Sequence, residues 1–219
     1  MSDPRTTSTH AHGTPQGLGP GDGDWDARYA ATDQVWSGRP NAALVTEVAG
    51  CEPGRALDVG CGEGADAVWL ALNGWEVTAL DVSSVALQRA ALAAEQAGAQ
   101  VQWVHAGLLD ASLPAATFDL VSAHYPVLLR TPSHDAERAL IDGVAPGGLL
   151  LVVHHADVDP EHAKEQGFDP ADYVSPSDVA ALLSDDWDVS LDERRPREVH
   201  GGAGALHTHD VVLRARRPV

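Results

Sequence analysis

LDVGCGEG, residues 57–64, is a glycine-rich turn between a short apolar run, residues 55–60, and a segment with apolar residues at helical spacing, residues 64–73. A strand, a glycine-rich turn and a helix in succession are typical of the ligand site at the carboxyl edge of an open α/β sheet. The glycines follow G-x-G-x-G spacing, whereas dinucleotide folds that hold a pyrophosphate use G-x-G-x-x-G. The turn therefore predicts a nucleotide-like ligand but does not favour a dinucleotide.

An acidic residue, Asp81, ends the next strand-like run, residues 76–82, seventeen positions after Gly64. A carboxylate in this place accepts hydrogen bonds from both hydroxyls of a ribose. Ser83 follows as the N-cap of a helix that we expect to run to about Ala97. The acid and the glycine turn together predict a nucleoside-like ligand more strongly than either does alone.

Further apolar runs predict strands at residues 101–105, 118–123, 149–154, 187–191 and 206–215. Helix-length segments separate the first five strands of the chain, which is typical of βαβ units in a parallel sheet covered on both faces. The last two strands have no helix between them, and we expect them to be antiparallel neighbours. Before them, Ser175-Pro176-Ser177-Asp178 predicts the start of a helix over residues 176–183.

Acidic residues dominate the composition: 32 Asp and Glu against 14 Lys and Arg give 219 residues a formal charge of −18. Lys164 is the only lysine, so the chain lacks the basic stripe that nucleic-acid binding requires, and anionic membrane surfaces are disfavoured too. The polar residues 1–23 predict a disordered tail, and residues 24–219 predict a single domain. With no membrane-length apolar run or secretory signal, we expect a soluble, cytoplasmic, bacterial protein.

The text LDVGCGEGADAVWLA (57–71), VTALDVS (77–83) and APGGLLL (145–151) resembles the class I S-adenosylmethionine (SAM) dependent methyltransferases, over about residues 25–156. WDARYAATDQVWSGRPN (25–41) further resembles the small-molecule branch with tellurite-resistance and thiopurine-type methyltransferases. The resemblance implies a Rossmann-like, doubly wound, mostly parallel seven-stranded sheet with an antiparallel C-terminal strand. It also implies SAM as the cofactor and a small-molecule substrate.

The resemblance implies a set of cofactor contacts. Its glycines would line the methionine part of SAM, with an acid supporting the amino group, a second acid holding the ribose and an apolar residue packing on the adenine. In that order, these residues are Gly60, Gly62, Gly64, Asp58, Asp81 and Val82, with Trp36 over the methionine end and Cys61 buried beneath the cofactor. Gly107 stands where the family usually has an acid for the adenine amino group, so either Asp110 or the backbone near Leu108 replaces it.

Histidines at the expected strand ends are candidates for a general base, which is needed only if the acceptor arrives protonated. They are His124 (beside Tyr125), His154 and His155. On an antiparallel last strand, His207 and His209 would share a face and converge with His154 and His155. The alternatives are a substrate anchor, a metal site, or histidines bonded only to backbone and solvent. The spacing does not support a metal site, and we expect none.

The N-terminal aromatic residues Trp25, Tyr29 and Trp36 allow two interpretations: a lid over the cationic sulfur, or a staple of the first helix to the sheet. Arg28 and Arg39 either meet the SAM carboxylate or balance nearby acids. Residues 157–174, rich in Asp, Glu, Pro and Gly, predict a lid-like insertion over the substrate.

The sequence favours a SAM-dependent methyltransferase acting on a small molecule by in-line displacement. A catalytically silent SAM-binding regulator and, more remotely, a nicotinamide-dependent oxidoreductase are alternatives; the acceptor atom and the oligomeric state stay open. Residues 154–198 carry 13 acids and four bases, a net charge of −9. This field attracts cationic SAM and opposes an oxyanion such as tellurite, which argues against the tellurite part of the resemblance.

Overall fold

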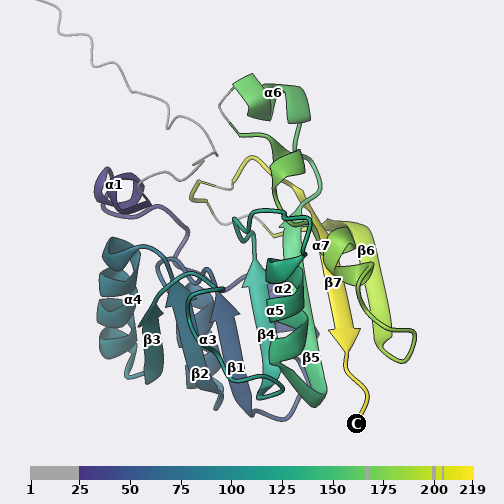
Figure 1. The fold of residues 1–219 in the computed structure, drawn as a ribbon. Coiled ribbons are helices and arrows are strands. Elements are labelled where there is room, and N and C mark those ends of the chain that lie inside the picture. Colours follow the sequence, from purple (N-terminus) through teal and green to yellow (C-terminus); the bar gives the residue numbers. More distant parts are fainter. Residues whose placement is uncertain (1–24, 166–167, 199–200, 204) are drawn as a thin grey trace, which may run out of the picture.

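Seven strands form one sheet in the order β3-β2-β1-β4-β5-β7-β6 (Figure 1). The computed structural model describes residues 25–165, 168–198, 201–203 and 205–219, so the tail expected at residues 1–23 lies outside the described residues. The strands are β1 (Arg55–Val59), β2 (Glu76–Asp81), β3 (Val101–His105), β4 (Phe118–His124), β5 (Val144–His155), β6 (Asp188–Pro196) and β7 (His209–Arg216).

The sheet is mostly parallel, as predicted. β1 pairs in parallel with β2 and β4, and the parallel pairs β2–β3 and β4–β5 extend the sheet on either side. β7 is antiparallel to both β5 and β6. Because the chain order reverses between β1 and β4, their carboxyl ends border the crevice where open α/β sheets bind ligands.

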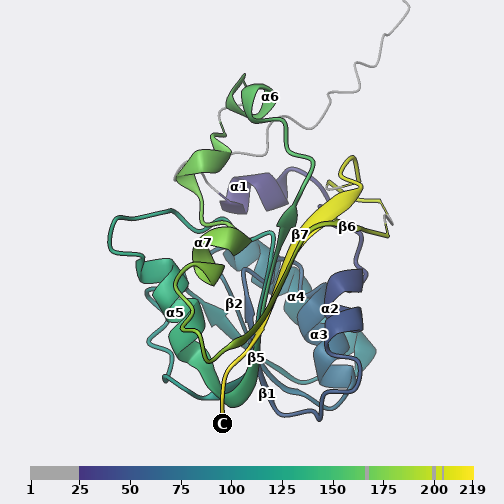
Figure 2. The same ribbon diagram turned by 90° about the vertical axis from the view of Figure 1, so that its right-hand side faces the viewer.

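Helices cover both faces of the sheet (Figure 2). α2 (Ala42–Glu47), α3 (Ala65–Leu72) and α4 (Ser84–Ala97) lie on one side, and α5 (Asp135–Gly143) and α7 (Pro176–Ala180) lie on the other. α1 (Trp25–Ala30), α6 (Pro160–Glu165) and the short 3-10 helix η1 (Pro170–Asp172) lie above the carboxyl edge. Among the described residues, no helix is long and apolar enough to cross a membrane.

Each face of the sheet buries its own apolar cluster. Leu44, Leu70 and Leu151 belong to the cluster under α2 and α3, and Leu140 and Leu150 belong to the one under α5 and α7. Successive strand residues point to opposite faces, so the two clusters also show which polar strand residues share a face.

Several predicted boundaries differ from the structure. β5 begins at Val144, five residues before the predicted Leu149, because the expected turn Pro146-Gly147-Gly148 lies inside a strand whose register with β4 shifts there. β7 begins at His209 instead of residue 206, β6 spans residues 188–196 instead of 187–191, and α7 ends at Ala180 instead of residue 183. The nine-residue helix α5 was not predicted.

Two predicted helix starts are confirmed. The Ser83 hydroxyl accepts a hydrogen bond from the Ala86 amide at the start of α4, which ends at Gly98 in the left-handed conformation. Ser175 and Asp178 form a reciprocal capping box at the start of α7. Both caps satisfy amides that the first helical turn leaves without a partner.

Gly64→Ala is expected to destabilise the protein more than Gly98→Ala does. Both glycines have positive φ, +80° and +71°, so each substitution costs about 1 kcal/mol of backbone strain. A Cβ at Gly64 would also lie 2.7 Å from Ala90 Cβ and 2.9 Å from the Trp103 ring, whereas a Cβ at Gly98 meets nothing within 4 Å. Overpacking at Gly64 is expected to lower the free energy of unfolding by about a further 1–3 kcal/mol. Urea unfolding of the two variants and the wild type measures the difference. Equal losses would contradict this packing argument.

Candidate functional site

The glycine turn after β1 brings the backbone over the carboxyl end of β2. Gly60, Gly62 and Gly64 have φ values of +70°, +52° and +80°, which side chains rarely adopt. The amides of Gly60 and Cys61 both donate to the Leu80 carbonyl, at 2.9 and 3.0 Å. A Cβ on Gly60 would meet nothing within 4 Å, so space for a ligand lies beside this residue.

Asp81 fastens the turn to the end of β2. Its Oδ2 accepts the Gly62 amide and its Oδ1 accepts the Ser83 amide, both at 2.8 Å. Burial raises the pKa of this carboxyl, and the backbone hydrogen bonds from Ser83 and Gly62 oppose that rise. Each carboxylate oxygen accepts more than one hydrogen bond, so the group retains capacity for ligand hydroxyls.

Asp58, on β1, is a buried carboxylate with an unused oxygen. It is 2% exposed, and its Oδ2 has no hydrogen-bond partner among the described residues. Burial, reinforced by the negative charges of Asp66 and Asp81, raises its pKa well above the usual value. A buried acceptor without a partner is costly, and a cationic donor placed here would satisfy it.

The N-terminal aromatic residues lie against the turn. Trp36 Nε1 donates to the Tyr29 hydroxyl at 2.9 Å, and a Cβ on Gly62 would lie 2.9 Å from that hydroxyl and 3.1 Å from Trp36 Nε1. Arg28 lies over the Trp25 ring at 5.2 Å and over the Trp36 ring at 5.9 Å. Tyr29 and Trp36 thus pack the N-terminal segment onto the turn; their role as a lid over the sulfur stays a prediction.

Carboxylates hold this N-terminal segment, residues 25–41, in place. Asp26 accepts the hydroxyls of Ser83 and Ser84 at the start of α4, at 2.6 and 2.9 Å. Glu63 accepts the amides of Val35 and Trp36, and pairs with Arg89 at 2.8 Å.

At the end of this segment, Asn41 donates two hydrogen bonds to the Asp66 carboxylate, one from its backbone amide and one from its side-chain amide, both at 2.7 Å. The segment is therefore fixed to both helices that flank β2, α3 and α4.

The predicted adenine side has an exposed apolar residue and a nearby acid. Val82 is 51% exposed, whereas Leu108 is buried in the core. A Cβ on Gly107 would lie 3.2 Å from Asp110 Oδ2 and 3.7 Å from Val82 Cγ1. Asp110 thus lies next to the position where the sequence lacks the usual acid.

His124, the last residue of β4, contacts a carboxylate through one ring nitrogen. Its Nδ1 lies 3.1 Å from Ser122 Oγ and 3.5 Å from Asp66 Oδ2. Its Nε2 is buried and has no hydrogen-bond partner among the described residues. Burial lowers the pKa of His124, while Asp66 opposes the fall, so the ring is neutral at pH 7. A proton on Nδ1, facing Asp66, leaves the lone pair of Nε2 available.

The sequence analysis missed Asp210, a second buried carboxylate beside a candidate histidine. Asp210 is 4% exposed, accepts the Tyr125 hydroxyl at 3.0 Å and lies 3.4 Å from His155 Nδ1. His155 stacks between Tyr125 and His207, with ring centroids 4.1 and 4.0 Å apart. Asp210 directly follows His209 at the predicted carboxyl edge, which is the one signal that would have identified it.

The expected convergence of four histidines is wrong. By strand alternation, His154 points to the α5 and α7 face, whereas His124 and His155 point to the α2 and α3 face. His207 precedes β7 and stacks on His155, whereas His209 pairs with Asp157 at 3.2 Å. Within the described ranges, no group of three or more His, Cys, Asp or Glu is arranged to hold a metal ion.

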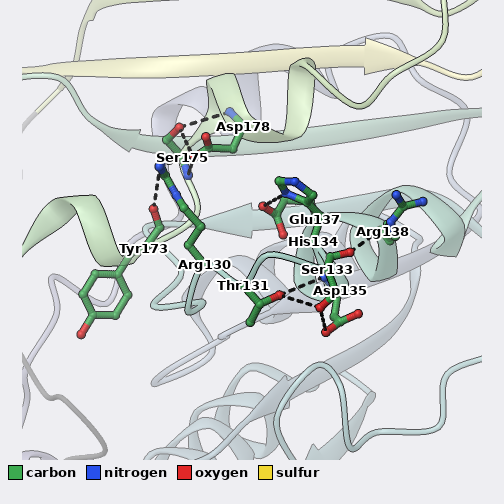
Figure 3. Close-up of polar contacts among 10 residues, drawn as sticks. All are labelled: Arg130, Thr131, Ser133, His134, Asp135, Glu137, Arg138, Tyr173, Ser175 and Asp178. Carbon is green, nitrogen blue, oxygen red and sulfur yellow. Dashed lines mark hydrogen bonds and ion pairs between the residues drawn. The ribbon is translucent and has the colours of Figure 1, made fainter.

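The expected lid segment, residues 157–174, contains α6 and η1. Phe168 stacks on Tyr173, and an isolated β-bridge joins Tyr173 to Leu129 in the loop after β4. Arg130 of that loop donates to Asp178 at 2.5 Å and to the Tyr173 carbonyl at 3.5 Å (Figure 3). The C-terminal end of the segment is therefore tied to the β4–α5 loop; its role as a substrate lid stays a prediction.

The two cysteines are free thiols. Burial raises the pKa of Cys61 well above its usual value, with Asp58 and Asp81 adding to the effect. A thiol with a raised pKa is a poor nucleophile, which disfavours covalent catalysis by Cys61.

Comparisons with known proteins find methyltransferases. Residues 56–148 match the model of a methyltransferase domain. A protein of Mycobacterium tuberculosis (strain H37Rv), named an uncharacterized methyltransferase, is 35% identical over 122 residues, 55% of this chain and 61% of that protein. A release factor glutamine methyltransferase of Bordetella pertussis is 38% identical over 126 residues, 54% of this chain and 45% of the enzyme. The chain thus spans about three fifths or less of these relatives' lengths.

One solved structure covers nearly the whole chain. It comes from work on the conversion of a disulfide bond into a thioacetal group during echinomycin biosynthesis. The two chains are 26% identical with a TM-score of 0.66, over 89% of this chain and 91% of the other. The similarity therefore extends beyond residues 56–148 to the C-terminal strands.

The stability of the fold is expected to fall between about pH 6.5 and pH 4. Burial, helped by the charge of His155, lowers the pKa of His154 to about 4, so the unfolded chain binds a proton there before the folded protein does. The contribution of the neutral His154 ring to the free energy of unfolding is complete above pH 6.5. It falls by up to about 3 kcal/mol as the pH drops to about 4.

Urea unfolding at pH 7 and pH 4.5 measures this loss in the wild type and His154→Phe, with the exposed His162→Phe as the control. The loss should shrink in His154→Phe alone. An unchanged pH dependence in that variant would contradict the assignment of the low pKa to His154.

Proposed function

We propose that this chain, a member of the class I SAM-dependent methyltransferases, transfers the methyl group of SAM to a small-molecule acceptor. The observation that carries the proposal is the pairing of the glycine turn with two buried carboxylates at the carboxyl edge. Asp81 bonds the Gly62 amide, and Asp58 has an oxygen without a partner among the described residues. The methyltransferase relatives support the methyl-transfer part of this proposal.

These residues fit SAM by their chemistry. The unpartnered Asp58 oxygen suits the cationic ammonium of the methionine part, and the open space at Gly60 allows close approach of a ligand to the backbone. Asp81 has remaining acceptor capacity for the ribose hydroxyls. Val82 would pack on the adenine, with Asp110 near its amino group in place of the usual acid.

When bound, SAM would supply a methyl group activated by its sulfonium, open to in-line attack by a nucleophile with S-adenosylhomocysteine as the leaving group. The role of the chain is then to align the acceptor and exclude water. Tyr29 and Trp36 cover the turn, and the carboxylates of residues 26, 63 and 66 keep the covering segment in place.

His124 is our first candidate for the base. Its Nε2 accepts the acceptor's proton while Asp66, next to Nδ1, stabilises the resulting cation. His154 is less suited, because a pKa of about 4 makes it a weak base at neutral pH. His155 is an alternative, oriented by Asp210 but enclosed between two rings.

The acceptor class rests on charge. A polyanion such as RNA or DNA would be repelled by a chain with a formal charge of −18. A small molecule that is neutral, or whose charge is matched by nearby side chains, would not be repelled in this way. The Bordetella relative methylates a release factor by its name, so a protein acceptor is the main alternative within this chemistry. A silent SAM-binding regulator would share the cofactor contacts and lack turnover.

Asp81→Ala is expected to weaken binding of S-adenosylhomocysteine by more than about tenfold, because both ribose hydrogen bonds and the Gly62 tether are lost. Isothermal titration calorimetry measures this, with the exposed Asp185→Ala as a charge-matched control. Tight NADH binding by the wild type without any response to SAM would refute the methyltransferase proposal.

His124→Gln is expected to bind S-adenosylhomocysteine as the wild type does but to lose methyl transfer by about 10²–10⁴-fold. The measurement is S-adenosylhomocysteine release from SAM with a panel of small thiols, amines, phenols and carboxylic acids. Full activity in His124→Gln would refute the base assignment. Cofactor binding without turnover on any acceptor would favour the silent regulator.

A further inference from the structure

A cavity of about 160 Å³ lies beside the proposed cofactor site. We call it the side cavity; its walls include Ser37, Arg39, Asn41, Tyr125, Arg197 and Asp210. These residues come from the N-terminal segment, the end of β4 and the paired strands β6 and β7. None of them belongs to the glycine turn or to the acids that would hold the cofactor.

The side cavity is connected to the proposed base through two of its wall residues. Asn41 donates two hydrogen bonds to Asp66, and Asp66 lies 3.5 Å from His124 Nδ1. Tyr125, another wall residue, directly follows His124 in the chain. The proposed base therefore lies behind this part of the wall.

Tyr125 has a strained backbone conformation, and several contacts fix its side chain. Its φ is +52°, a conformation that costs an aromatic residue about 1–2 kcal/mol and is found mainly where function requires it. The hydrogen bond to Asp210, the stack on His155 and the Val153 carbonyl, which accepts its amide at 2.7 Å, hold it there. Arg197 lies 5.2 Å from the ring centroid.

The walls of the side cavity gather three arginines on a chain of formal charge −18. Arg39, Arg195 and Arg197 lie there with two acids, Glu198 and Asp210, and Arg195 is matched by two further acids, Glu47 and Asp192. The two Asp210 oxygens are already engaged, one by the Tyr125 hydroxyl and the other by His155 Nδ1, so they repel an incoming anion less than a free carboxylate would.

The three arginines of the walls differ in the partners that their guanidinium groups already have. Arg195 pairs with Glu47 and Asp192, which matches its charge. Arg197 lies 3.8 Å from Asp210, donates to the His207 carbonyl at 3.3 Å and has a further charge contact with the Tyr125 ring. Arg39 is exposed at the cavity, and across the described residues its guanidinium forms no ion pair. Arg39 therefore presents donors to an anionic group, at a wall where the positive charge of Arg197 also lies.

We propose that the side cavity binds the methyl acceptor through a carboxylate, held by Arg39 and Arg197, so that the substrate class is a small organic acid. The inference rests on the proposed methyltransferase function. A guanidinium matches a carboxylate with two parallel hydrogen bonds, and the Tyr125 ring offers an apolar surface for the carbon skeleton. The acidic remainder of the chain disfavours anions in general, so selection depends on this local pair of arginines.

The test uses three probes that share a ring but differ in charge: benzoate, benzamide and benzylamine. Each is titrated by ligand-observed NMR into the full chain saturated with S-adenosylhomocysteine. Benzoate is expected to bind about tenfold more tightly than the other two, the size of one charge-assisted bidentate contact. Arg39→Gln and Arg197→Gln should each remove most of this preference, whereas the exposed Arg138→Gln should leave it unchanged.

Three results would overturn the inference: tighter binding of benzylamine, an equal affinity for all probes, or a benzoate preference that survives in both arginine variants. A fourth concerns the carboxylate of the cofactor itself. If Arg39→Gln weakens S-adenosylhomocysteine but not 5′-methylthioadenosine, which lacks the amino-acid tail, the cavity holds the cofactor's carboxylate. Failure of the proposed function is separate, because the wild type would then either not bind S-adenosylhomocysteine or bind it without turnover on any acceptor.

Discussion

The left-handed glycine turn after β1 is the constraint on which the site depends. With φ between +52° and +80° at three alternate positions, the chain turns over the end of β2 and enters α3 within five residues. Because the turn passes over β2, the Gly62 amide reaches the Asp81 carboxylate. Because Gly62 has no side chain, Tyr29 and Trp36 lie directly on it, and because Gly64 has none, Ala90 and Trp103 pack close. A side chain at either position would separate the turn from its cover or from α4.

The acidic composition has a local explanation as well as a global one. Asp26, Glu63, Asp66 and Asp81 each accept two or more hydrogen bonds, mostly from backbone amides and hydroxyls, and together they fix the N-terminal segment and the turn. Carboxylates are suited to this work because they only accept hydrogen bonds and bind amides strongly. Part of the charge of −18 is therefore structural, and the arginines stand out in the few places where they gather.

The fold was largely predictable because its signals are local. The glycine turn, the acid seventeen residues later and the apolar runs predicted the parallel strands and their ligand edge. The start of β5 was wrong because Pro146-Gly147-Gly148 reads as a turn, whereas the structure places it in a strand with shifted register. Asp210 was missed because its partners Tyr125 and His155 lie 85 and 55 residues away, and only the pairing of β5 with β7 brings them together.

Strand alternation then decides which of the candidate residues can act together. All five of these residues point to the face covered by α2 and α3: Asp58 on β1, Asp81 on β2, His124 on β4, His155 on β5 and Asp210 on β7. They lie at the edge where β1, β2, β4 and β5 end and the antiparallel β7 begins. His154 points to the other face, so its neighbours are α5 and α7. On the shared face these residues follow the order of the strands. The acids proposed to hold the cationic nucleoside, Asp81 and Asp58, lie on β2 and β1, and His124, next to Asp66, follows on β4. Beyond it come Tyr125, Asp210 and the arginines of the side cavity. Acids dominate the cofactor side of this line and arginines gather at its other end, which suits the proposed cationic methyl donor on one side and the proposed anionic acceptor on the other, with His124 between them.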